Sequence, residues 1–464
     1  MIQRENFIDE RRIHQHLEEG KGKSAEEIRE VLHKAGEGKG IDPPEAAALL
    51  QVENPSLIGE MFQTARGVKE RIYGKRLVLF APLYLSNHCL NNCQYCGFRR
   101  ENLQITRRRL SPEEIHDQVQ QLERLGHKRL LLECGELPLS DMDFVEEAIA
   151  TIYATKNGRG EIRRVNVNIA ATSVKNYRRL KAAKIGTYQL FQETYHRSTY
   201  KNLHVGPKSD YDRQLFAHDR AMEGGIDDVG LGVLFGLYDY KFEVLALLYH
   251  ALHLEAKFGV GPHTISVPRW RPAQGVDLTL PHPVADESFK KVMASLRLAV
   301  PYTGLILSTR EGVEMRSEAF SLGISQTSAG SRTSPGGYAE KGEEGKKEEN
   351  EQFRVADHRS PDEIIQSICR LGYLPSFCTA CYRRGRTGKS FMDKAKPGDI
   401  QELCGPNALL TFKEYLEDYA TGDTRQIGEE RIHEHLVEIA NPTLRRQTES
   451  RLQDIEGGKR DLFF

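Results

Sequence analysis

The sequence predicts an α/β fold built on a (βα)₈ barrel of the TIM type. From Arg76 onward, eight short apolar runs alternate with amphipathic segments of helical period. Several of these runs are almost continuously apolar, as expected for parallel strands covered on both faces. An open doubly wound sheet alternates strands and helices in the same way and is the alternative. The count of eight strands favours the barrel.

The helices between the predicted strands carry recognisable start signals. Ser111-Pro-Glu-Glu114 combines a capping box with proline at the first helical position, and Ser360-Pro-Asp-Glu363 begins a later helix in the same way. The predicted strands are Leu77–Leu85, Arg129–Leu132, Val165–Ile169, Tyr188–Gln192, Val229–Phe235, Thr264–Val267, Gly304–Ser308 and Gly323–Gln326.

Changes in composition divide the chain into three predicted domains. Residues 1–72 are polar and helical in pattern, and the barrel follows at 73–358. Within it, residues 334–352 form a charged, low-complexity insert that cannot bury apolar surface and is expected to be mobile. Residues 359–464 are predicted to form a helical C-terminal domain with its own cysteine cluster.

The bulk properties exclude several classes of partner. The chain has 464 residues, a net charge of −1 and a pI of about 7.0, which gives no electrostatic reason to expect nucleic acid or an anionic membrane as partner. No apolar run approaches the roughly 20 residues that span a bilayer, and the N-terminus has no apolar signal core. We therefore expect a cytoplasmic protein, in which cysteines serve as metal ligands rather than in disulfides; six of the eight cysteines fall into two tight clusters.

The first cysteine cluster follows directly on the first predicted strand. Cys89, Cys93 and Cys96 have the spacing C-x₃-C-x₂-C. Three thiolates can hold three irons of a [4Fe–4S] cube and leave the fourth iron open, at the strand end where barrel active sites lie. A zinc site is the alternative, but zinc usually takes four ligands, and the nearest fourth candidate, His88, is adjacent to Cys89.

This spacing, with Tyr95 before the last cysteine, resembles the signature of the radical S-adenosylmethionine (SAM) superfamily. The resemblance implies that the open iron binds SAM and that an electron from the cluster cleaves SAM to a 5′-deoxyadenosyl radical. Gly135 and Glu136, after the second predicted strand, resemble the family's Gly-Gly-Glu contact to the methionyl amino group. Cys134 replaces the first glycine and is interpreted as a small buried residue.

Two further positions are predicted SAM contacts by resemblance. Glu193 stands in Gln192-Glu-Thr-Tyr195, which is similar to a segment of the aromatic amino acid lyase branch, and is a candidate for the ribose or the sulfonium. Arg220 is a candidate for a bidentate contact to the SAM carboxylate, and Arg213 is the alternative.

A second triad, Cys378, Cys381 and Cys404, has the spacing C-x₂-C-x₂₂-C. It again supports an incomplete cube, an auxiliary [4Fe–4S] cluster, whereas a zinc ribbon needs a second complete cysteine pair. Cys369 is interpreted as a packed helix residue. Two triads in this order resemble the HydG family, whose relative, the 2-iminoacetate synthase of thiamine biosynthesis, lacks the C-terminal triad.

The same resemblance implies residues for a second site and for the substrate. His263, at the start of a predicted strand, is a candidate ligand for an extra iron at the auxiliary cluster. Arg310 and Arg332 follow the last two predicted strands and are candidates for binding a tyrosine carboxylate.

The resemblance implies a carbon–carbon lyase that cleaves L-tyrosine to p-cresol and dehydroglycine. Dehydroglycine is then converted to CO and cyanide on iron at the auxiliary cluster, for the active site of [FeFe]-hydrogenase. The implied partners are an electron donor of the ferredoxin or flavodoxin type and the hydrogenase maturation proteins. The alternatives are a 2-iminoacetate synthase that forms no CO or cyanide, and a zinc-stapled binding protein without catalysis.

Overall fold

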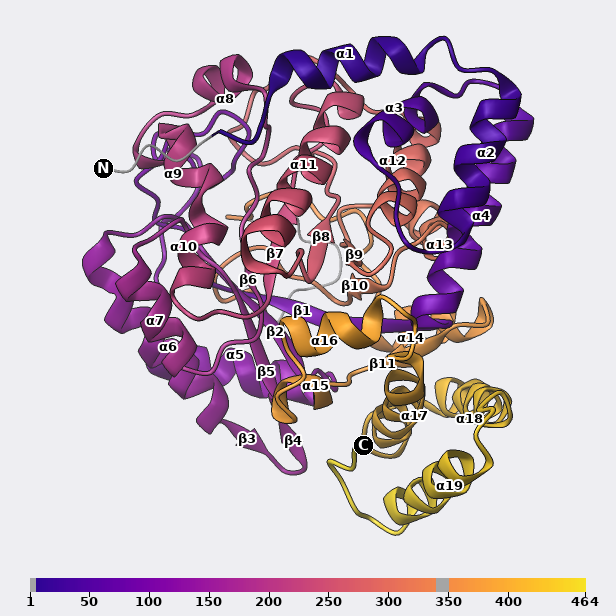
Figure 1. Cartoon of the computed structure of the whole chain (residues 1–464). Helices are drawn as coiled ribbons and strands as arrows, with labels where there is room; N and C mark the ends of the chain where they lie inside the picture. Colours follow the sequence, from indigo (N-terminus) through magenta and orange to yellow (C-terminus); the bar gives the residue numbers. More distant parts are fainter. Residues whose placement is uncertain (1–5, 339–349) are drawn as a thin grey trace.

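The predicted barrel is present and closed. In the computed structural model, which describes residues 6–338 and 350–464, eight parallel strands surround one axis (Figure 1). They follow one another in chain order, and the last pairs with the first through Val78↔Gln326. This closure excludes the open doubly wound sheet. The barrel strands are β1 (Arg76–Ser86), β2 (Arg129–Cys134), β5 (Arg164–Asn168), β6 (Tyr188–Gln189), β7 (Val229–Gly232), β8 (Thr264–Ser266), β9 (Gly304–Leu307) and β10 (Gln326–Ser328).

The predicted position of the last strand, Gly323–Gln326, is wrong. The strand begins at Gln326, because Gly323 has a φ of 127° and turns the chain, and its carbonyl accepts a hydrogen bond from Arg297 Nε at 3.1 Å. The apolar residues before Gln326 therefore belong to the turn. Three short strands were not predicted: β11 (Leu374–Ser376), which pairs with the start of β1, and the hairpin of β3 (Lys156–Asn157) and β4 (Gly160–Glu161).

Helices cover the outside of the barrel and extend both ends of the chain. The capping boxes predicted at Ser111 and Ser360 are confirmed. The helices are α1 (Glu10–Gly20), α2 (Ala25–Gly36), α3 (Pro43–Gln51), α4 (Pro55–Tyr73), α5 (Pro112–Arg124), η1 (Leu139–Asp141), α6 (Met142–Ala154), α7 (Val174–Ala182), α8 (Arg197–Leu203), η2 (Pro207–Ser209), α9 (Tyr211–Leu215), α10 (Ala217–Glu223), α11 (Tyr240–Phe258), α12 (Asp286–Ala299), α13 (Val313–Ser321), α14 (Pro361–Arg370), α15 (Ala380–Arg383), α16 (Lys389–Ala395), α17 (Gln401–Asp418), α18 (Gly422–Val437) and α19 (Pro442–Glu456).

The N-terminal helices α1–α4 wrap around barrel helices α11 and α12 (Figure 1). Lys291 of α12 donates to the carbonyl of Val52 at 3.0 Å, which fixes the end of α3. At the other end of the chain, α17 packs on β11 and α18 and α19 pack on α17. The three-domain division itself stays a prediction. No helix within residues 6–338 or 350–464 is long and apolar enough to cross a membrane.

Part of the predicted mobile insert at 334–352 is anchored. Residues 339–349 lie outside the part of the chain that the structure describes. On their N-terminal side the Tyr338 hydroxyl donates to the carbonyl of Pro82 at 2.9 Å, and on the other side the Gln352 N–H donates to Thr333 at 2.9 Å. Both flanks are therefore tied to the barrel.

An apolar layer crosses the inside of the barrel. Phe80, Leu131 and Ile306 form a small buried cluster that is separate from the main core. Val78 and Arg129 stand two residues earlier on β1 and β2 and line a different cavity. Phe80, Leu131 and Ile306 themselves line the first of the two cavities, and they lie along the strands between it and the second cavity.

Candidate active site

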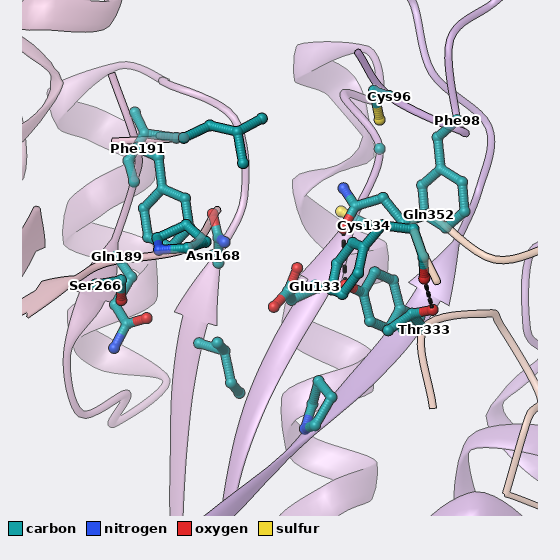
Figure 2. Close-up of a pocket in the computed structure, with 18 of the residues that line it drawn as sticks. Cys96, Phe98, Glu133, Cys134, Asn168, Gln189, Phe191, Ser266, Thr333 and Gln352 are labelled. Atoms are coloured by element: carbon teal, nitrogen blue, oxygen red, sulfur yellow. Dashed lines mark hydrogen bonds between the residues drawn. The ribbon is translucent and has the colours of Figure 1, made fainter. Parts of the chain in front are cut away.

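The larger cavity opens at the carboxyl ends of the strands, where the first cysteine triad lies. It encloses about 1410 Å³, counting the space open to solvent. In Figure 2, Phe191, Gln189, Asn168 and Ser266 line one side, and Cys96, Phe98, Cys134 and Gln352 line the other. The predicted site residues in its wall are Cys89, Cys93, Cys96, Tyr95, Gly135, Glu136, Glu193 and Arg310.

Backbone and side-chain donors surround the first thiol of the triad. Cys89 Sγ accepts hydrogen bonds from the N–H groups of Glu136 at 3.3 Å and Asn91 at 3.5 Å. Such donors stabilise a thiolate, the form that binds iron. Cys93 is buried and Cys96 is half-buried, and burial raises the pKa of Cys96 to about 11. These thiols therefore favour the protonated form until a metal takes the proton's place.

Gly135 brings the end of β2 against the cysteine loop. A Cβ atom at this position would lie 2.2 Å from the backbone oxygen of His88, so only glycine fits without a backbone shift. Its N–H donates to Ser86 at 3.0 Å, and the next residue, Glu136, accepts from the Asn91 side chain at 2.7 Å. The geometry thus fits a cluster loop that shares its pocket with Glu136.

Arg213 contacts Glu136, and Arg220 does not. Arg213 Nη2 lies 2.6 Å from Glu136 Oε1, while its Nη1 is buried without a partner among the described residues. Arg220 donates to backbone carbonyls, including that of Thr172 at 3.0 Å, and is not part of the cavity wall. Arg213 is not part of that wall either, but it lines a smaller adjoining cavity together with Gly135 and Glu136, where Arg220 is absent.

Glu193 is held in an uncommon backbone conformation. Its φ is 69°, and the following residues, Thr194 and Tyr195, are both anchored to the buried carboxylate of Glu243 in α11. The Glu193 carboxylate forms an ion pair with Lys208 at 2.7 Å. Sequence reasoning missed Lys208, because the pairing depends on a loop that returns from residues 204–210.

Tyr95 is fixed by a neighbour that the sequence did not indicate. Its hydroxyl lies 2.9 Å from His204 Nε2, and its carbonyl accepts from the Trp270 indole at 3.1 Å. Burial lowers the pKa of His204 to about 3, so its ring is neutral at physiological pH. The loop after β8 therefore closes over the cysteine loop through Trp270.

Of the two predicted substrate arginines, the structure brings only Arg310 into the cavity. Its guanidinium carbon lies 3.2 Å from the centre of the Phe353 ring. Among the described residues it has no hydrogen-bonded acidic partner, so its guanidinium can donate hydrogen bonds to a ligand. Arg332 is not part of the cavity wall.

Two residues of β2 in this cavity were missed or misread. Glu133 lies in the wall, and burial raises its pKa to about 7. Cys134 packs against the main core but is only half-buried and also lines the cavity, so its interpretation as a small buried residue missed its exposure to the cavity. Successive side chains of a strand point to opposite faces, so Glu133 points into the barrel on the same side as Leu131. This alternation could have identified Glu133 from the sequence.

The second cysteine triad lines a cavity at the opposite mouth of the barrel. Cys378 and Cys381 flank the start of α15, and Cys404 comes from α17. Arg76 and Arg129, from the first residues of β1 and β2, line the same cavity, and both have a buried Nε without a partner among the described residues. This donor set and its positive surroundings fit an anionic thiolate-held cluster. Cys369 is buried in the core on α14, as expected.

His263 faces this second triad. It lines the same cavity, packs on Phe391 at 4.6 Å between ring centres, and has a buried Nδ1 without a hydrogen bond. Asp228 lies 3.6 Å from that nitrogen. Burial lowers the pKa of His263, so the imidazole is neutral and has a lone pair to offer a metal. Its predicted place beside the auxiliary site is thus geometrically possible.

Comparisons with known proteins agree with this arrangement. The model of the radical SAM superfamily matches residues 83–248, which implies one [4Fe–4S] cluster and SAM, and that of the biotin and thiamin synthesis associated domain matches residues 266–374. The 2-iminoacetate synthases of Salmonella typhimurium and Escherichia coli are 31% and 30% identical over 358 residues, 76% of this chain and 90% of theirs.

Two solved structures match almost the whole chain. A crystal structure of HydG, a maturase of the [FeFe]-hydrogenase, is 56% identical with a TM-score of 0.96, and covers 99% of this chain and 100% of that one. HydG from Carboxydothermus hydrogenoformans is 43% identical with a TM-score of 0.84, over 96% and 97% of the two chains. This chain therefore belongs to the HydG family of radical SAM enzymes.

Proposed function

We propose that this protein cleaves L-tyrosine to p-cresol and dehydroglycine and converts dehydroglycine to CO and cyanide on iron for [FeFe]-hydrogenase. The observation that carries the proposal is the second cavity, at the far end of the barrel, whose wall contains Cys378, Cys381, Cys404 and His263. A lyase that stops at dehydroglycine has no use for a second metal site. The two HydG proteins of known structure that match this chain are maturases of [FeFe]-hydrogenase, which supports a product used in hydrogenase maturation.

In the first cavity, Cys89, Cys93 and Cys96 would hold the cluster that, with SAM, supplies the 5′-deoxyadenosyl radical. Glu136 would receive the SAM amino group, and Arg213, paired with Glu136, would stand near the SAM carboxylate. The closed loop above Tyr95 and the buried walls would exclude water from a reactive radical.

Tyrosine would bind deeper in the same cavity with its carboxylate on Arg310. The guanidinium stacks on Phe353 and is buried in a cavity that a carboxylate can enter. A planar, permanently charged fork suits a carboxylate ligand. Arg332 has no comparable place in the wall.

In the second cavity, Cys378, Cys381 and Cys404 would hold the auxiliary cluster, which supplies the iron for CO and cyanide, with His263 as ligand of an extra iron. We assign the triad to a C-terminal domain at 359–464 that closes the mouth of the barrel at 73–358. The first residues of β1 and β2 contribute Arg76 and Arg129 to this site. The apolar layer of Phe80, Leu131 and Ile306 would separate the two chemistries.

The partners follow from the two halves of the reaction. The first cluster requires an electron donor, for which we propose a ferredoxin or flavodoxin. The iron-bound product would pass to the hydrogenase maturation proteins. The second candidate function is 2-iminoacetate synthase, which the identity of 31% to the Salmonella typhimurium enzyme favours.

The test is an anaerobic incubation of the reconstituted protein with SAM, dithionite and tyrosine, with p-cresol measured by chromatography and CO trapped by a haem protein. We expect both products. p-Cresol without CO would make the protein a 2-iminoacetate synthase, and the absence of both would refute the lyase assignment.

A further inference from the structure

Glu133 has no role so far, although its carboxyl lies in the wall of the first cavity. It stands on β2 one residue before Cys134 and pairs in register with Asn168 of β5. In Figure 2 its carboxyl lies at the edge of the open space, on the side that faces Phe191 and Asn168. The group therefore faces the volume in which a substrate has to sit.

Glu133 differs from the other two glutamates of this cavity. Glu136 is paired with Arg213 at 2.6 Å, and Glu193 is paired with Lys208 at 2.7 Å. No cation forms a salt bridge with Glu133 among the described residues; its carboxyl interacts with the hydroxyl of Tyr84. Of the three carboxyls, it is the one free to take up a proton from a ligand.

Burial and three groups from different elements set the charge state of this carboxyl. Burial and Glu193 raise its pKa, whereas Arg310 and the hydroxyl of Tyr84 lower it, and the result is a pKa of about 7. Tyr84 is itself held in place, since its hydroxyl donates to Gln352 Oε1 at 2.8 Å. Such a group exchanges protons readily near neutral pH.

Arg310 stands close enough to Glu133 for each charge to affect the pKa of the other. The α-carboxylate and α-ammonium groups of an amino acid are bonded to the same carbon atom. A ligand whose carboxylate rests on Arg310 therefore presents its ammonium group within reach of a neighbouring carboxylate. The pairing of a free cation and a free anion matches the two charges of a zwitterion.

We propose that Glu133 is the general base that deprotonates the α-ammonium group of the substrate amino acid held by Arg310. The inference rests on the proposed lyase function and deepens it. A proton leaves the substrate nitrogen and an O–H bond forms on the Glu133 carboxylate, with no electron transferred. The neutral amine has the lone pair that an ammonium lacks, so its nitrogen can share the unpaired electron once a hydrogen atom is removed.

Glu133→Gln tests the proposal, because glutamine keeps the shape and loses the base. We expect p-cresol formation to fall by about 100- to 10,000-fold, the usual contribution of a general base. Iron content and SAM binding should stay near those of the wild type. The pH dependence of kcat/KM gives the sharper readout. In the wild type, kcat/KM should rise with pH through about 7 as Glu133 ionises. This rise, the acid limb of the pH profile, should disappear in Glu133→Gln.

Glu123→Gln is the matched control. Glu123 is also buried with a pKa raised to about 7, but it lies at the end of α5 and not in the cavity wall. Its variant should keep the wild-type rate and pH profile. Should Glu133→Gln fail to take up iron, Glu133→Asp serves instead and is expected to be slower while retaining the acid limb.

Three results would overturn the inference: an unchanged rate in Glu133→Gln, an unchanged acid limb, or loss of SAM binding, which would make Glu133 a SAM ligand. Loss of the acid limb in Glu133→Asp would do the same. If the wild-type protein forms no p-cresol from tyrosine, the proposed function itself fails, and that failure is seen before any variant is measured.

Discussion

Replacing Cys378, Cys381 and Cys404 together with alanine is expected to abolish CO formation while p-cresol formation continues at near the wild-type rate. The three thiols line a cavity at one mouth of the barrel, and Cys89, Cys93 and Cys96 line another at the opposite mouth. The layer of Phe80, Leu131 and Ile306 lies between them. Loss of one cluster should therefore leave the other in place. The measurement is p-cresol and CO from the same anaerobic reaction.

Two controls make this result interpretable. Cys369→Ala removes a buried cysteine from α14 that lies in neither cavity, and should leave both products unchanged. Cys93→Ala should abolish both products, because the radical is formed at the first cluster. Continued CO formation by the triple variant would refute the assignment of the second site.

Arg310→Ala is expected to lower kcat/KM for tyrosine by about 30-fold to several thousand-fold, since truncating one partner of a buried charge pair costs about 2–5 kcal/mol. The guanidinium is the one predicted substrate arginine in the cavity wall, and stacking on Phe353 orients it. Arg310→Lys should recover only part of the loss, because an ammonium cannot form a two-pronged contact. Steady-state rates of p-cresol formation give the values.

Arg332→Ala provides the comparison for this experiment. Arg332 follows the last barrel strand at a position analogous to Arg310, yet it is absent from the cavity wall. We expect its kcat/KM to change by less than about threefold, because a substitution outside the binding cavity removes no contact to tyrosine. An equal loss in both variants would show that Arg310 acts through the fold rather than through tyrosine.

The barrel could be predicted because its strands are short, apolar and separated by helices with clear start signals. The strand after residue 323 was misplaced because apolar character does not distinguish a strand from the turn before it; the left-handed conformation of Gly323 decides the boundary. Barrel closure itself is a pairing between β1 and β10, whose paired residues are 248 positions apart, and no local pattern contains it.

The cysteine triads could be predicted because metal ligands leave a spacing in the sequence. The groups around them could not. Glu133 is a carboxylate at a strand end like many others in the sequence. It lacks a salt bridge because the nearby cations Arg213 and Lys208 pair with Glu136 and Glu193. Likewise Arg76 and Arg129 meet the second triad only because β1 and β2 begin at the mouth that the C-terminal helices close.

The account depends most on two separate clusters at the two ends of one barrel. Electron paramagnetic resonance of the reduced, iron-reconstituted protein tests this directly, recorded with and without SAM. We predict two [4Fe–4S] signals, of which SAM shifts only one, and the signal that SAM leaves unchanged should vanish when Cys378, Cys381 and Cys404 are replaced. A single signal in the wild-type protein, or a SAM shift that disappears with those three cysteines, would contradict the account.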